Sequence, residues 1–318
     1  MNQKPQGVNY LVMAIKVIIS LAALVFMVHY FSAKSDIIIS SMPLILSLLE
    51  HQWLAPFLVL FTGLNWLLES KKWQLLIKQE ESITLFASLK AVLSGVTIGL
   101  FTPNRIGEYA GRIWFVKNKV HAISSTVIGN ICQLAVTLVF GMLSLLFFTP
   151  SKKMLLHIIN AKLIFPVFLA ILVFLLLYRF RISIWRWLSN KNINSLTTLV
   201  NSACGFNLPI IFQTLLLSVI RYVSFVLPFA LVLAYFYQSA LLPFLWIVPL
   251  TYFIQTFIPS FAIAEIGVRV ASIGYIMESI QINPEPAIIA SIFIWILNVM
   301  LPSFIGIIFI WQTKITPA

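Results

Sequence analysis

Residues 101–112 read FTPNRIGEYAGR, and residues 257–269 read FIPSFAIAEIGVR. Each stretch follows a long apolar segment and carries a proline, a glutamate and, four residues after the glutamate, an arginine. Proline interrupts a helix, and an interrupted helix in hydrocarbon is tolerated only where protein or a water-filled cavity satisfies its freed backbone groups. The two stretches therefore predict two broken helices around a polar site.

The composition predicts a chain that lies in a membrane. Of the 318 residues, 60% are hydrophobic and 9% are charged, against roughly 25% charged in an ordinary soluble domain. Apolar segments of about 20 residues, enough to cross a hydrocarbon core of about 30 Å, recur along the chain. We therefore expect one all-α integral membrane domain over residues 1–318. The apolar segments are 10–31, 53–68, 83–101, 123–148, 163–178, 208–236, 241–258 and 287–311.

The positive charge of the chain fits membrane topology better than nucleic-acid binding. The formal net charge is +12, but the basic residues are scattered in short loops, where they set orientation and meet anionic headgroups. Cys132 and Cys204 have no Cys-x-x-Cys spacing, so we expect no metal, redox site or cofactor. The sequence contains no Gly-rich phosphate loop, nucleophile elbow or His-Glu-x-x-His motif, which argues against an enzyme.

The positive-inside rule predicts that segments 83–101 and 241–258 turn back within the membrane. Basic clusters flank the first segment on both sides, and both remain cytoplasmic only if it forms a re-entrant hairpin. We therefore expect about six full transmembrane helices plus two re-entrant helical hairpins, at about 83–117 and 241–280. The halves 1–150 and 151–318 then form an inverted repeat, which is typical of secondary transporters. The flanking clusters are Lys71, Lys72 and Lys78, and Arg105, Arg112, Lys117 and Lys119.

Polar residues around the two breaks are candidates for binding an anionic substrate. Glu108 and Arg112 are four residues apart and share one helical face. Glu265 and Arg269 repeat this spacing. Each pair is either a structural ion pair or part of a ligand site. The second alternative is favoured by the helix break before each pair, because the N-terminus of a helix attracts anions. The residues at the breaks themselves are Pro103, Asn104 and Pro259.

Two further arginines lack an obvious neutralising partner. Arg221 lies near the middle of segment 208–236, where a lone cation costs about 2.5–3.5 kcal/mol on insertion scales. We expect Glu265 or Glu108 to be its partner, in a structural ion pair or in a substrate site. Arg105 offers a bidentate fork to phosphate, or else extends to the membrane interface.

Five amide side chains lie within the expected spans. Such groups more often form hydrogen bonds between helices than contacts with substrate. We therefore expect most of them to hold neighbouring helices together. They are Asn65, Asn130, Gln133, Gln255 and Asn298.

The motifs resemble those of a known membrane family. Residues 100–112 resemble the Pro-x-Arg-x-Gly-Glu/Asp…Arg signature of the lysylphosphatidylglycerol synthase transmembrane family, also called flippase-like proteins. Residues 259–269 are similar to its second signature, although residues 261–264 lack the glycines common there. The resemblance implies a multi-pass protein of the bacterial inner membrane that moves lipids or lipid-linked sugars between leaflets. Because the chain ends at Ala318, we expect the soluble synthase domain and its activity to be absent.

Three functions compete on these observations. The first is a lipid translocase with an anionic phospholipid or lipid-linked substrate bound between the hairpins. The second is an intramembrane transferase with Glu108 or Glu265 as base, and the third is a scaffold for a cell-envelope synthase. A transferase usually needs a donor-binding loop, and the chain offers almost none, so we favour the translocase. An oligomer is compatible with each of the three.

We predict that both termini lie on the cytoplasmic side, because the hairpins add no net crossing and the remaining spans are even in number. Reporter fusions at Ala318 measure this directly. A C-terminus on the outer side would mean that one hairpin spans fully, and the inverted repeat would be lost. The cluster Lys152, Lys153 and Lys162, which this topology places outside, is the main observation against it.

Overall fold

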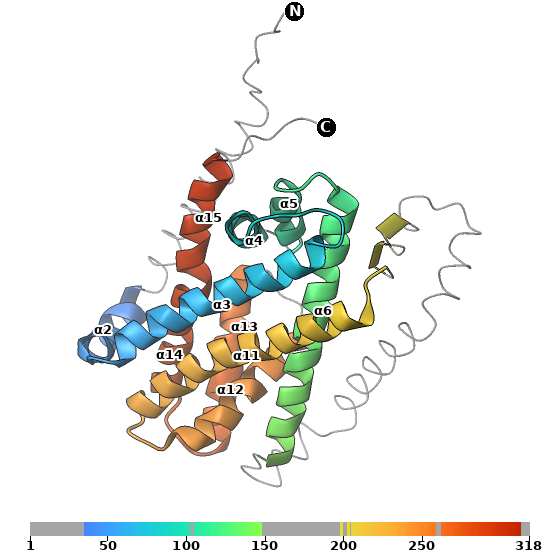
Figure 1. Cartoon of the computed structure of the whole chain (residues 1–318). Coiled ribbons are helices and arrows are strands. Elements are labelled where there is room, and N and C mark those ends of the chain that lie inside the picture. Colours follow the sequence, from blue (N-terminus) through green and yellow to red (C-terminus); the bar gives the residue numbers. More distant parts are fainter. Residues whose placement is uncertain are drawn as a thin grey trace, which may run out of the picture.

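The computed structural model describes residues 35–100, 102, 105–147, 198–199, 202–203, 205–258 and 262–312, and every regular element within them is a helix (Figure 1). Pro103, Asn104, Pro259, Cys204 and the expected spans 10–31 and 163–178 lie outside these ranges. The elements are α2 (Ser35–Glu50), α3 (Leu54–Ile77), α4 (Leu85–Gly99), α5 (Gly107–Ile113), α6 (Lys119–Phe147), α11 (Leu208–Phe236), α12 (Leu241–Thr256), α13 (Ala262–Ser279), α14 (Glu285–Trp295), the π-helix η1 (Ile296–Met300) and α15 (Leu301–Gln312).

Among the described residues, three helices are long and apolar enough to cross a membrane. They comprise 27, 29 and 28 residues, at Lys119–Leu145, Leu208–Phe236 and Glu285–Gln312. At 1.5 Å per residue each is about 40 Å long, which exceeds a hydrocarbon core of about 30 Å. Helices α4 and α12, with 15 and 16 residues, reach only about 23 Å. The chain is thus an all-helical, multi-pass membrane protein, and the count of six full spans stays a prediction.

Helix α3 corrects one boundary expected from the sequence. Segment 53–68 was expected to end before a basic loop, but the helix continues to Ile77 and buries Lys72, which is 1% exposed. Glu69, on the preceding turn, lies 2.6 Å from the Lys72 ammonium, and this partner makes the burial of a lysine tolerable. Lys72 is therefore an interior residue, so it does not report which side of the membrane the loop occupies.

Helices α4 and α5 pack backbone against backbone through glycines. Gly95 and Gly99 are one turn apart on α4, and Gly107 and Gly111 are one turn apart on α5. A Cβ at Gly107 would lie 2.5 Å from the carbonyl oxygen of Ile98, and a Cβ at Gly111 would collide with the backbone of Gly95. Small residues permit such close approach of helices in membranes. The chain therefore folds back tightly between α4 and α5.

Four helices of the first half can be matched, in chain order, with four of the second half. The series α3, α4, α5, α6 corresponds to α11, α12, α13 and the continuous α14–η1–α15 helix. Helix α3 packs along α11, while α4 packs on α15 and α12 packs on α6 (Figure 1). This pattern of contacts is unchanged when each helix is exchanged for its counterpart. An approximate two-fold relation between the halves would produce it, and the inverted repeat stays a prediction.

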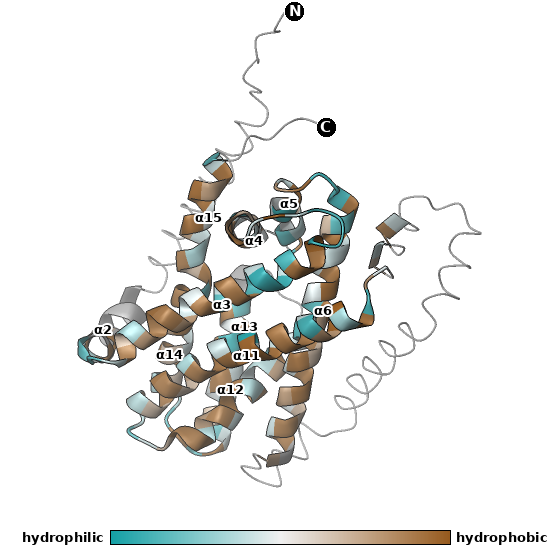
Figure 2. Cartoon of the chain, viewed as in Figure 1, coloured by the Kyte–Doolittle hydropathy of each residue, from teal (hydrophilic) through white to brown (hydrophobic). Residues whose placement is uncertain are grey.

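The bundle has an apolar core and a polar interior region beside it. Phe229, Ile247, Ile276 and Ala290 are buried in a cluster that joins α11, α12, α13 and α14. Most of the helical ribbon in Figure 2 has the colour of hydrophobic residues, and hydrophilic residues occur on the C-terminal half of α3 and at α13. The polar residues that follow the two breaks are thus held inside an otherwise apolar bundle.

We predict that Gly111→Ala destabilises the protein by about 1–3 kcal/mol, because the new methyl group overpacks the contact with α4. Gly63→Ala is the matched control, since a Cβ at Gly63 on α3 meets no atom within 4 Å. Unfolding of the purified protein in detergent measures both changes. Equal stability of the two variants would contradict the close packing of α4 and α5.

Candidate functional site

A cavity of about 590 Å³ lies between the two halves of the chain. This volume is in the range of small-molecule sites, about 300–1,000 Å³. Its walls come from α3, residues 105–112, α6, α11, α12, α13 and η1. The structure places every charged candidate among the described residues on this cavity, although substrate binding itself stays a prediction. These residues are Arg105, Glu108, Arg112, Arg221, Glu265 and Arg269.

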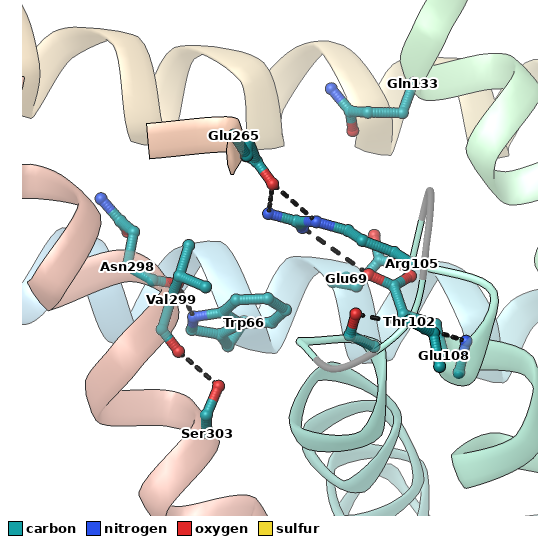
Figure 3. Close-up of polar contacts among 12 residues, drawn as sticks. Trp66, Glu69, Thr102, Arg105, Glu108, Gln133, Glu265, Asn298, Val299 and Ser303 are labelled. Atoms are coloured by element: carbon teal, nitrogen blue, oxygen red, sulfur yellow. Dashed lines mark hydrogen bonds and ion pairs between the residues drawn. The ribbon is translucent and has the colours of Figure 1, made fainter. Parts of the chain in front are cut away.

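Arg105 joins the two sequence motifs across the cavity. Its Nη2 and Nε lie 2.6 and 3.0 Å from Oε2 of Glu265, and its Nη1 lies 3.6 Å from Oε1 of Glu108 (Figure 3). The backbone of Arg105 has a φ of 56°, a left-handed conformation that costs about 1–2 kcal/mol for a residue with a Cβ. A short charge-assisted pair is among the stronger polar contacts in proteins, so it can offset this strain.

Thr102 fixes the start of α5. Its hydroxyl oxygen accepts a hydrogen bond from the backbone N–H of Gly107 at 2.7 Å, and its O–H donates to the carbonyl of Gly99 at 3.2 Å. The backbone N–H of Arg105 donates to the Thr102 carbonyl at 3.2 Å. Freed backbone groups near a helix break need such partners where water is excluded. The sequence analysis did not single out Thr102, although Ser and Thr are common at helix starts.

Both motifs form the expected pairs between residues four apart. Arg112 Nη2 lies 3.6 Å from Glu108 Oε2, and Arg269 Nη2 lies 3.0 Å from Glu265 Oε1. Arg112 also donates to Glu69 Oε1 at 2.9 Å. Each glutamate therefore has the arginine four residues after it as a partner, in addition to Arg105, which lies between the two glutamates.

Glu69 is a site residue that the sequence analysis missed. Its carboxylate lies 2.6 Å from Lys72 Nζ, 2.9 Å from Arg112 Nη2 and 3.3 Å from Arg221 Nη1. The side chain is 3% exposed and lines the cavity. The spacing of Glu69 and Lys72, three residues apart on one helix, was the available signal. Both residues lie beyond the apolar part of α3, so hydropathy alone predicts a loop at this position.

Arg221 pairs with Glu69, so the predicted partners Glu265 and Glu108 were wrong. Helix α11, which contains Arg221, packs along α3, and this packing determines which carboxylate Arg221 can reach. This packing brings the guanidinium to the charged end of α3. Arg221 Nη1 also donates to Oε1 of Gln133 at 3.1 Å.

Arg221 is the cation in excess at this end of the cavity. The carboxylate it contacts is already paired with two other cations, and its Nε has no hydrogen-bond partner in the described part of the chain. Its guanidinium lies 5.7 Å from the Trp66 ring and 5.9 Å from the Phe225 ring, distances that permit cation–π attraction. Arg221 is therefore positioned with donor capacity to spare.

The amide side chains of the spans divide into two groups. Gln133 donates to a backbone carbonyl of α11 at 3.4 Å, and Gln255 accepts from an arginine of α13 at 3.2 Å. These are the hydrogen bonds between helices that the sequence predicted. Asn65 and Asn298 differ, since their buried amide oxygens have no hydrogen-bond partner among the described residues. All four line the cavity, as does Asn130.

The cavity carries an excess of positive charge. Among the described residues, four arginines and three glutamates line it, and Lys72, 2.6 Å from Glu69, adds another cation. Uncompensated charge inside a membrane is expensive and marks functional sites. Guanidinium groups around a cavity attract anions and offer bidentate hydrogen bonds to phosphate or carboxylate. The arrangement can therefore bind an anionic group inside the bundle.

Comparison with known proteins identifies a family. A family model described as "Lysylphosphatidylglycerol synthase TM region" matches residues 13–306. The match includes both sequence motifs and all the residues that line the cavity. No curated protein and no solved structure matches the chain.

We predict that Glu69→Gln destabilises the protein far more than Arg221→Met does. The first change leaves buried cations without their carboxylate, a loss that costs about 3–5 kcal/mol. The second leaves Glu69 with two cations and should cost well below that. Denaturant unfolding in detergent compares the two. Equal losses would contradict the assignment of Arg221 as the excess cation.

Proposed function

The chain belongs to the lysylphosphatidylglycerol synthase transmembrane family, and from this premise we propose that it is a lipid translocase. The headgroup of an anionic phospholipid or lipid-linked substrate enters the cavity and passes between the leaflets of a bacterial inner membrane. The acyl or prenyl chains remain in the hydrocarbon. The lipid is moved without chemical change.

The observation that carries this proposal is the positively charged cavity inside an apolar bundle. Burying four arginines at one place is costly even with three carboxylates beside them. A purely structural network would be balanced by an equal number of acidic groups. An anionic headgroup supplies the missing negative charge, so the cost is recovered when substrate binds.

In this proposal α4–α5 and α12–α13 are the two re-entrant hairpins of an inverted repeat. Helices α4 and α12 are too short to cross, and each is followed by a motif that breaks the helix. The symmetric contacts, α4 with α15 and α12 with α6, support a repeat. Both termini then lie in the cytoplasm, and access alternates as one repeat moves against the other.

The Arg105–Glu265 pair is suited to be the contact that opens during this cycle. Each partner has a second ion pair within its own motif, Arg105 with Glu108 and Glu265 with Arg269. The two motifs can therefore separate without leaving either charge alone in the membrane. When the Arg105–Glu265 contact is formed it stabilises the state in which the two motifs lie together. The remaining ion pairs lower the free-energy cost of the state in which the motifs are apart.

Arg221 is the proposed anchor for the substrate phosphate. Its Nε has no hydrogen-bond partner among the described residues, and a guanidinium presents two parallel N–H groups to a phosphate. The flanking rings of Trp66 and Phe225 hold the side chain in place. Substrate would then compete with Glu69 for this arginine and loosen the contact between α3 and α11.

Reconstitution in liposomes with fluorescent lipids of different headgroups tests the proposal. A membrane-impermeant quencher reports which leaflet each lipid occupies, and we expect anionic lipids to exchange faster than in protein-free vesicles. We expect Arg221→Met to slow this exchange by about tenfold or more, since a hydrogen bond to a charged group contributes about 1.5–3 kcal/mol.

Lys90→Met is the matched control for that variant. Lys90 is also a cation on an apolar helix, but it lies against Phe86 and Phe309, away from the cavity. Its replacement should leave the exchange rate unchanged. Absence of exchange for every headgroup would overturn the translocase, and a chemically altered lipid would point to a transferase instead.

A further inference from the structure

Lys72 is a buried cation that has no part in the proposed transport cycle. Its side chain is 1% exposed and lies against α6 at Gly129, where an added Cβ would be 3.4 Å from Lys72 Cε. Its Nζ lies 2.6 Å from Oε2 of Glu69. Apart from this ion pair, Nζ has no hydrogen-bond partner among the described residues, although an ammonium has three N–H donors. The protein therefore compensates the charge of Lys72 only in part.

Lys72 belongs to a cluster in which one carboxylate contacts three cations. The two arginines of this cluster act on Lys72 electrostatically as like charges, and Glu69 opposes them. The buried thiol of Cys132, on α6, also lies near enough to interact with Lys72. We call the set the Glu69 cluster, which comprises Glu69 and, at 2.6, 2.9 and 3.3 Å from its carboxylate, Lys72, Arg112 and Arg221.

Within the Glu69 cluster, Lys72 is the residue whose charge can change. Arginine stays protonated at every accessible pH. A carboxylate in contact with several cations stays ionised. A lysine, in contrast, can release its proton where burial and neighbouring cations disfavour the ammonium. The positive charge of the cluster is therefore adjustable at one residue.

We infer that Lys72 is a proton-binding site, and that one proton and one negatively charged headgroup bind to the Glu69 cluster together. This rests on the proposed function and adds its coupling ion. With Lys72 neutral and no headgroup bound, the cluster has two positive charges and one negative charge. With Lys72 protonated and a singly charged phosphodiester bound, the extra positive and negative charges cancel. The empty and the loaded protein then bury the same net charge, so neither state carries an additional electrostatic cost in the membrane.

Glu69 provides the route by which the proton reaches Lys72. Its carboxylate lines the cavity and contacts Lys72 Nζ. On release, an N–H bond of the ammonium breaks as an O–H bond forms on Glu69. The carboxylic acid then gives this proton to water that enters the cavity, which leaves a neutral amine and a carboxylate. Uptake is the reverse of these two steps.

Coupling between proton and headgroup has a thermodynamic consequence. If a bound anion favours the protonated Lys72, protonation of Lys72 favours anion binding by the same factor. The affinity for an anion therefore falls as pH rises through the range in which Lys72 of the empty protein loses its proton. Because one proton accompanies each singly charged headgroup, the transport is electroneutral, and a pH difference can drive it.

Lipid binding to the full chain in a neutral detergent tests this coupling without transport. The probe is short-chain phosphatidylmethanol, a phosphodiester that keeps a single negative charge from about pH 6 to pH 10, a range that covers a buried lysine. We expect its affinity to fall by up to about tenfold per pH unit within this range. A pH indicator in weakly buffered solution should report uptake of up to about one proton per bound lipid. Binding without proton uptake across the whole range would overturn the inference, and this measurement needs no variant.

The variant Lys72→Met should fold, because Glu69 keeps two arginines as partners. We expect it to bind phosphatidylmethanol without proton uptake and with an affinity that does not change with pH. Lys90→Met, a lysine on α4 away from the cavity, and Cys132→Ala are the controls, and both should keep the uptake. Proton uptake that persists in Lys72→Met, or that is lost in Cys132→Ala, would assign the proton to another group.

Liposomes with a pH difference across the membrane separate this inference from the translocase itself. We expect a fluorescent anionic lipid to accumulate in the leaflet that faces the alkaline side, by up to about tenfold for a difference of one pH unit. Exchange that does not respond to the pH difference overturns the inference and leaves the translocase standing. Absence of exchange under every condition overturns the translocase, and the inference with it.

Discussion

In the part of the chain that the structure describes, seven charged side chains line one cavity inside an otherwise apolar bundle, and hydrocarbon does not tolerate charges without partners. This constraint explains much of the arrangement. Glu69 requires cations, so α3, α11 and α5 must lie close enough for Lys72, Arg221 and Arg112 to reach it. Neutralisation within the membrane thus fixes the relative positions of helices that no loop joins.

Close backbone packing makes the charge network geometrically attainable. Helix α5 has only seven residues and could not hold its position by an apolar face alone. The glycines at positions 95, 107 and 111 let it lie against α4. The Thr102 hydroxyl accepts a hydrogen bond from the backbone N–H of Gly107 at the start of α5. The motif therefore has two tasks. Its glycines and threonine shape the break, while its arginines and glutamate face the cavity.

The sequence predicted the membrane class, the two broken helices and the charged residues after each break. Those charged residues stand in motifs with a recognisable spacing. Charged residues are rare in this apolar chain, so each one inside or beside an apolar segment is conspicuous. The partner of Arg221 could not be predicted, because contacts between α3 and α11 depend on how distant helices pack. For Glu69 the sequence offered one signal, its spacing of three residues from Lys72. The left-handed backbone of Arg105 also escaped prediction, since this conformation is more typical of glycine and asparagine.

The π-helix at Ile296–Met300 has a consequence for the span that contains it. Each residue of an α-helix turns the side-chain direction by about 100°, and a π turn adds one residue to the count. The face of this span that lines the cavity carries Asn298. Further along, Gly306 closely approaches Leu93, and the Ser303 carbonyl accepts a hydrogen bond from Thr97 at 2.8 Å. The extra residue therefore rotates the part of the span that packs on α4 relative to the part that lines the cavity, compared with an unbroken α-helix of the same sequence.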